Sequence, residues 1–196
     1  MNPVCSWAGR FQLIAMLAVA LLFSSGCASS PKTNLDKIRA DWSGPETRGL
    51  TLPYYDKDVE AICDPPIGWK ADPLKTSSSH IHQVWLSPTG ASAYGVIYFK
   101  LPLPVGENLA LSGFLDQMKD TEGDSTLIER HEDPKLPGIR FVADGGLYRI
   151  RVNFIVATWE GWAVYAGSLR GKPVVADELD LAVRAREHTY MGSLQK

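Results

Sequence analysis

The feature that most constrains this chain is an apolar block close to its start. The 13 positions 11–23 are apolar except for Gln12, and Arg10 is the basic side chain that precedes them. Residues 24–26 are Ser-Ser-Gly, and Cys27 follows. A basic start, an apolar run of about 7–15 residues and small residues at its end are typical of a secretory signal peptide. A membrane-spanning helix needs about 20 apolar residues. The block therefore predicts a targeting segment that is not part of the folded domain.

The end of this block carries a more specific pattern. Ser25-Gly26-Cys27 resembles the lipobox of bacterial lipoproteins, although Ser24 departs from it because the family prefers leucine there. The resemblance implies that residues 1–26 are removed, that the Cys27 thiol receives a diacylglycerol group and that the new amine is acylated. Two alternatives stay open from the residues alone, namely ordinary signal cleavage near Ala28 and an uncleaved anchor.

The residue after the cysteine bears on the destination. Ala28 follows Cys27, and in Gram-negative lipoproteins of this kind the lack of an aspartate there implies sorting to the outer membrane. Each buried methylene of an acyl chain contributes about 0.8 kcal/mol, so several chains give stable attachment. We therefore expect an exported protein, held by its N-terminal lipid on the outer membrane or on another periplasm-facing membrane surface.

Composition excludes several classes of protein. The net charge of −2 argues against a broadly basic nucleic-acid binder. The 45% hydrophobic and 21% charged residues are ordinary for a globular domain. Three cysteines are too few for a disulfide scaffold. If Cys5 leaves with the signal peptide and Cys27 carries lipid, Cys63 is the remaining thiol, and we expect it to be buried and inert.

The mature chain divides into a tether and one domain. Residues 27–49 are rich in Ser, Pro, Thr, Lys and Asp, which predicts a lipid-attached flexible tether with a short helix over 34–42. Residues 50–196 are expected to form a single α+β domain.

Within that domain, alternating and helical periodicities and turn-forming residues predict six strands and two helices in a defined order. A hairpin is expected first, then a helix, a strand, a meander of three antiparallel strands and a final helix. The predicted strands are 80–86, 93–101, 125–129, 138–143, 147–158 and 163–169, the helices are 107–121 and 176–188, and polar turns are expected at 131–134 and 159–162.

Helices separated along the chain by an antiparallel sheet predict a layered α+β sandwich. This order of elements, the entry Pro66-Ile67-Gly68-Trp69 and the end Met191-Gly192-Ser193 resemble the PsbP-like superfamily over residues 62–194. The resemblance implies helices packed on an antiparallel sheet and carries no catalytic motif. A cystatin-like or other open-sheet domain stays open as an alternative.

Two histidines are the candidates for metal chemistry. His80 and His82 are two residues apart, so on a strand they share one face and could both ligate Zn²⁺ or Cu²⁺. A third ligand would have to come from elsewhere, and His131 with Glu132 and Asp133 has suitable side chains. The competing interpretation is a polar strand start and an exposed turn, and we predict no metal or other cofactor.

Four residues are candidates for contact with a partner. Arg149 and Arg151 lie on the polar face of the longest predicted strand, and Trp159 and Trp162 flank a predicted hairpin tip. Such side chains could meet anionic lipid, glycan or an acidic envelope protein. The alternatives are solvated arginines and tryptophans that fold back onto the sheet.

We therefore expect a membrane-anchored cell-envelope lipoprotein with a non-enzymatic binding or interaction domain. One alternative is a metal-dependent or hydrolytic envelope enzyme that uses His80 and His82. A second alternative is a small-ligand binder with a pocket between helix and sheet.

Overall fold

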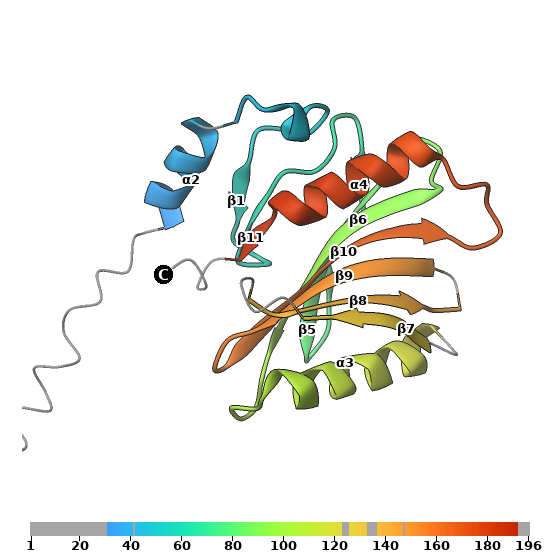
Figure 1. Cartoon of the computed structure of the whole chain (residues 1–196). Coiled ribbons are helices and arrows are strands. Elements are labelled where there is room, and N and C mark those ends of the chain that lie inside the picture. The colour runs from blue at the N-terminus through green and yellow to red at the C-terminus, as the bar shows by residue number, and fades with distance from the viewer. Residues whose placement is uncertain (1–30, 41, 123–125, 133–136, 147, 192–196) are drawn as a thin grey trace, which may run out of the picture. The chain divides into compact units, whose positions relative to one another are not determined.

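The structure is a computed structural model that describes residues 31–40, 42–122, 126–132, 137–146 and 148–191 (Figure 1). The expected signal peptide and Cys27 lie outside these residues. The helices, including one 3₁₀ turn, are α2 (Pro31–Ala40), η1 (Pro45–Thr47), α3 (Glu107–Glu122) and α4 (Ala176–His188). The strands are β1 (Tyr54–Asp56), β2 (Ala61–Cys63), β3 (Lys70–Ala71), β4 (Lys75–Thr76), β5 (His80–Leu86), β6 (Ser92–Lys100), β7 (Thr126–His131), β8 (Ile139–Asp144), β9 (Tyr148–Val156), β10 (Glu160–Leu169) and β11 (Tyr190–Met191).

The main sheet is antiparallel throughout. Its order is β3-β5-β6-β10-β9-β8-β7, and the short β4 also pairs with β5. Strands β8, β9 and β10 form the predicted meander, and β6 returns to pair with β10. A smaller sheet, β1-β2-β11, is also antiparallel. The expected antiparallel α+β fold is confirmed at this level.

The two main helices pack on opposite faces of the main sheet (Figure 1). On one face, Ala182 and Ala185 of α4 join a core with Trp85, Tyr94 and Trp162. Small side chains on α4 let the helix approach these aromatic residues closely. The indole Nε1 of Trp162 donates a hydrogen bond to the Val59 carbonyl at 2.9 Å, which satisfies its polar group inside the core.

On the other face, α3 packs mainly against the β8–β9 side of the sheet. Leu111 and Phe114 of α3 belong to a core that includes Phe141 and Phe154. The Phe114 ring centroid lies 5.4 Å from that of Phe154 and 6.3 Å from that of Phe141. The alternation predicted for the longest strand is confirmed, because Ile150 and its alternate neighbours in β9 are buried towards α3.

The segment expected to be a flexible tether is partly folded. Helix α2 covers Pro31–Ala40, and Arg39 Nε donates a hydrogen bond to the Pro53 carbonyl at 2.9 Å. The Trp42 ring meets the His188 ring edge-on, with centroids 5.6 Å apart. These contacts join α2 and Trp42 to the domain, in a segment for which the sequence predicted a flexible tether over 27–49. Leu35, Ile38 and Trp42 are half-buried and spaced three and four residues apart, so a segment of polar composition can still pack on the domain along one apolar stripe.

Two predicted turns are partly strand. His131 ends β7, so it does not belong to a turn, while residues 133–134 lie outside the described part of the chain. The turn expected at 159–162 is shorter, because β10 already begins at Glu160. Gly161, within the predicted turn, lies inside β10, and a Cβ there would come within 2.4 Å of the Phe99 ring. This glycine is a close-packing position.

Candidate functional site

A pocket of about 670 Å³ lies between α3 and the β5–β6 side of the main sheet. Helix α3 packs on β8 and β9, which leaves a space between the helix and strands β5 and β6. The volume falls within the range of about 300–1,000 Å³ found for small-molecule sites. The pocket is lined by Asp72, Lys75, Ser79, His80, His82, Val84, Leu86, Ala93, Ile97, Phe99, Lys100, Leu101, Val105, Leu109, Ala110, Gly113, Phe114, Gln117, Met118, Tyr148, Ile150 and Tyr165.

Most of this lining is apolar. The floor is formed by alternate residues of β5 and β6, such as Val84, Ile97 and Phe99, because successive side chains of a strand point to opposite faces. The roof is formed by α3, with Phe114 and Met118 among its residues. A surface of this kind favours an apolar molecule, since burial stabilises binding by roughly 25 cal/mol per Å² of apolar area.

One polar pair lies in this apolar surrounding. His82 on β5 and Tyr165 on β10 are joined by a hydrogen bond of 2.7 Å between Nε2 and the phenol oxygen. Strand β6 runs between them, and Gly95 faces both Val84 and Tyr165 in the register. A Cβ at Gly95 would lie 2.5 Å from the Tyr165 ring, so only glycine lets the ring cross β6 to reach His82.

The His82 imidazole is uncharged at neutral pH. Burial is the largest of the effects that lower its pKa to about 4; Lys75 and His80 also lower it, and Asp72 has a smaller opposing effect. A neutral imidazole and a phenol offer both donor and acceptor capacity without a fixed charge. The geometry therefore suits a ligand whose apolar body carries one neutral hydrogen-bonding group.

A second polar cluster joins α3 to the β4–β5 turn. His80 Nδ1 lies 2.9 Å from Ser77 Oγ and 3.2 Å from Gln117 Nε2. Gln117 Nε2 also donates to Ser79 Oγ at 3.2 Å. These exposed bonds link α3 to the turn that ends the pocket on the β5 side. They position His80 at the rim, whereas His82 lies deeper.

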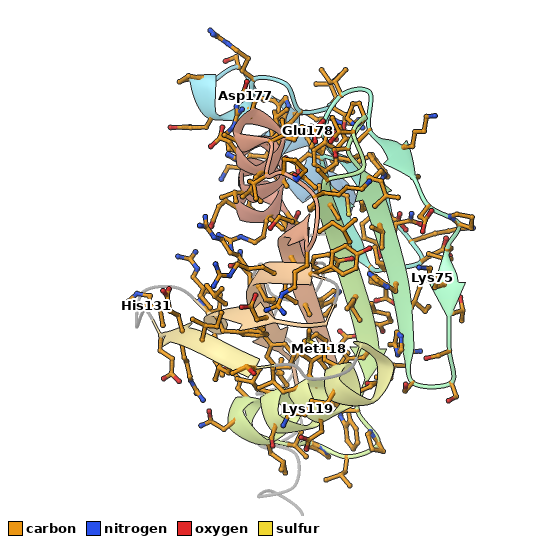
Figure 2. The ribbon with its side chains drawn as sticks, turned by 90° about the vertical axis from the view of Figure 1, so that its right-hand side faces the viewer. Lys75, Met118, Lys119, His131, Asp177 and Glu178 are labelled. Atoms are coloured by element: carbon orange, nitrogen blue, oxygen red, sulfur yellow. The ribbon has the colours of Figure 1, made fainter. Side chains whose placement is uncertain are left out.

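The histidine prediction is met in part. His80 and His82 share a face of β5 and line one pocket, as the spacing indicated. His131 ends β7 at the other edge of the sheet, and four strands separate β7 from β5, a distance of roughly 24 Å at 4.8 Å per strand. Figure 2 shows His131 and Lys75, whose strand pairs with β5, on opposite sides of the molecule. His131 is thus not a third ligand, and the described residues contain no group of three His, Cys, Asp or Glu side chains placed for a metal.

The four residues expected to contact a partner fall into different environments. Trp162 is fully buried, so it is not a surface anchor, because β10 begins before it and directs its side chain into the core. Trp159 remains 58% exposed in the β9–β10 turn. Arg149 and Arg151 are exposed on the face of β9 opposite the pocket. Cys63 is buried, as expected, and burial raises the pKa of its thiol.

Several pocket residues were not singled out from the sequence, above all Tyr165, Gly95 and Gln117. Residues 93–101 are rich in residues that favour strands, and a glycine among them indicates that another group approaches the backbone closely. The sequence does not show which group this is. Only the register of three strands shows that the Gly95 position lies under the Tyr165 ring.

An antiparallel α+β domain with an apolar pocket beneath one helix is the class that this fold and site define. No protein-family model matches the chain, and no curated protein matches it. None of the described helices is long and apolar enough to cross a membrane.

We expect Gly95→Ala to lower the free energy of unfolding by about 1–3 kcal/mol, because the new methyl group would overlap the Tyr165 ring. Urea unfolding of the full chain in a non-ionic detergent measures this loss. Gly113→Ala, inside α3, is the control and should not lower stability, since a Cβ there meets nothing within 4 Å and alanine favours a helix. Equal unfolding midpoints for the two variants would contradict the placement of the ring over β6.

Proposed function

We propose that the chain is a membrane-anchored lipoprotein of the cell envelope whose domain binds a small apolar molecule in the pocket beneath α3. The observation that carries this proposal is the apolar cavity of about 670 Å³ with the neutral His82–Tyr165 pair inside it. The role is binding, with no catalytic step assigned to the pair. Of the alternatives weighed from the sequence, the small-ligand binder is the one that this geometry favours.

The pocket also indicates the chemistry of the ligand. The Phe99, Phe114 and Ile97 side chains would contact an alkyl or ring system. A hydroxyl, carbonyl or amide group would bond to the His82–Tyr165 pair. Lys75 and Asp72 at the rim already form an exposed ion pair of 3.6 Å, so they give little net attraction for a charged ligand. A long-chain alcohol or a neutral lipid fragment fits this description.

The finer fold assignment is also a proposal. We infer that the domain is PsbP-like, which is supported by an antiparallel sheet with one helix in the middle of the chain and one near its end. The packing of α3 and α4 on opposite faces fits the layered sandwich that the resemblance implies.

Photolabelling tests the binding function. The probe is a long-chain alcohol with a mid-chain diazirine, added to the full chain reconstituted in phospholipid nanodiscs. We expect labelling to saturate with probe concentration and to be displaced by the unmodified alcohol. Labelling that rises in proportion to the probe and is not displaced would reflect only partition into lipid and would overturn the proposal.

The anchor has a separate test. We expect Cys27→Ser to block acylation and to move most of the chain from the membrane fraction to the soluble fraction, because several acyl chains supply the attachment. Immunoblotting of fractionated cells measures the distribution. Cys5→Ser is the control and should leave the chain in the membrane. A membrane fraction that is unchanged in Cys27→Ser would show that the anchor is not lipid.

A further inference from the structure

A cluster of five arginines lies on the sheet face opposite the pocket. Its members are Arg140, Arg149, Arg151, Arg170 and Arg186. Helix α4 covers β6, β10 and part of β9 on that face. Beyond the helix, the register places Arg151 opposite Val142 and Arg140 opposite Asn153, so these side chains share the face. Figure 2 shows nitrogen atoms gathered between α4 and the strand end that carries His131.

Two carboxylates form ion pairs with four of these arginines. Glu187 of α4 lies 3.4 Å from Arg140 Nη2 and also contacts Arg186. Along the strand, Asp144 lies 3.3 Å from Arg149 Nε and 2.9 Å from Arg170 Nη2. A single carboxylate shared by two guanidinium groups leaves positive charge uncompensated.

Arg151 adds a further charge. Among the residues that the structure describes, it has no ion-pair partner, and it is exposed. Glu129 on β7 is placed opposite Val142, and His131 opposite Arg140. Even with Glu129 included, the arginines of the cluster outnumber its carboxylates, whereas the whole chain is slightly acidic.

Arg186 is the unusual member, because it is only 9% exposed. Its Nε has no hydrogen-bond partner among the described residues, and its contact with Glu187 is shared with Arg140. Burial lowers the pKa of Arg186, Glu187 opposes this, and repulsion from Arg140 and Arg151 adds to the lowering. A buried guanidinium normally has its N–H groups paired, since an unpaired buried charge is costly.

We propose that Arg140, Arg151 and Arg186 form a binding site for a phosphate-type oxyanion. Guanidinium groups present planar pairs of N–H donors that match phosphate oxygens. An oxyanion would supply the negative charge that Glu187 alone does not. The site lies on the opposite face of the sheet from the pocket, so it does not depend on the proposed apolar ligand.

The phosphate could belong to a lipid headgroup or to a soluble phosphorylated compound. The ³¹P NMR signal reports both sources for the full chain in non-ionic detergent micelles. One arm titrates inorganic phosphate, and the other dopes the micelles with phosphatidylglycerol, with phosphatidylcholine as the zwitterionic comparison. Broadening in the first arm indicates recognition of the phosphate itself, whereas broadening by phosphatidylglycerol alone assigns the site to an anionic headgroup.

Substitutions decide whether the cluster is responsible. We expect Arg151→Gln to weaken the apparent affinity roughly fivefold or more. Arg130→Gln removes the same charge from the other face of the sheet, where Arg130 meets Glu132 and Asn108, and should change affinity by less than about twofold. Absence of broadening in both arms, or equal weakening by the two variants, would overturn the site.

Discussion

Gly113→Trp is expected to reduce saturable labelling by the diazirine alcohol roughly tenfold or more. Gly113 lines the pocket from α3, and a Cβ at this position would meet nothing within 4 Å. We expect an indole at this lining position to occupy part of the pocket, so the probe would lose apolar contacts with the floor. Tryptophan also has a higher helix propensity than glycine, so α3 should persist.

The neighbouring position provides the control. Ser112 is exposed on the same helix and does not line the pocket, so Ser112→Trp adds the same indole outside it. We expect this variant to be labelled like the unmodified chain. Unchanged labelling of Gly113→Trp, or equal losses in both variants, would mean that the probe binds elsewhere.

Asp64→Asn is expected to stabilise the domain and to remove most of the dependence of its stability on alkaline pH. Asp64 is fully buried, and neither carboxyl oxygen accepts a hydrogen bond from another described residue. The next two residues, Pro65 and Pro66, have no backbone N–H to donate. Burial therefore raises the pKa of Asp64 from 3.8 to about 9, with its own backbone N–H opposing the shift.

The sign of the pH effect follows from proton binding. Between pH 4 and pH 9 the folded domain keeps the Asp64 proton, whereas the unfolded chain releases it. Stability therefore falls as pH rises across this window, by about 1.4 kcal/mol per pH unit. The loss at pH 7 from this group is on the order of 4 kcal/mol, and an asparagine, which does not ionise, avoids it.

Urea unfolding between pH 7 and pH 9 measures this slope in the full chain, because below about pH 6.5 the lowered pKa of His82 changes stability in the opposite direction. The expected result is a steep decline for the unmodified chain and a much flatter curve for Asp64→Asn. Asp58→Asn, at an exposed position six residues earlier, should retain the decline. A steep decline that persists in Asp64→Asn would show that another group causes the pH dependence.

Local pattern predicted much of the fold. The alternation in residues 148–156 gave the correct buried face of β9, and the charges at the two ends of residues 176–188 fit α4. Both signals come from residues that are close together in the sequence. The smaller sheet was not anticipated, because β1, β2 and β11 have two or three residues each and carry too few positions to show a period.

The location of the pocket could not be predicted from the sequence, although a pocket between helix and sheet was one of the alternatives. Its size depends on how Phe114 and Leu111 hold α3 against β8 and β9, which leaves the β5 side open. The spacing of His80 and His82 correctly predicted a shared face. The partner of His82 is Tyr165, 83 residues away, and no local signal connects them.

The central claim is that an apolar molecule occupies the pocket beneath α3, and the position of the photolabel tests it most directly. Tandem mass spectrometry of the labelled full chain identifies the residues that carry the adduct. We expect adducts on Phe99, Phe114, Met118 and the other residues that line the pocket. Adducts confined to exposed positions outside it, such as Trp159 in the β9–β10 turn, would contradict the claim.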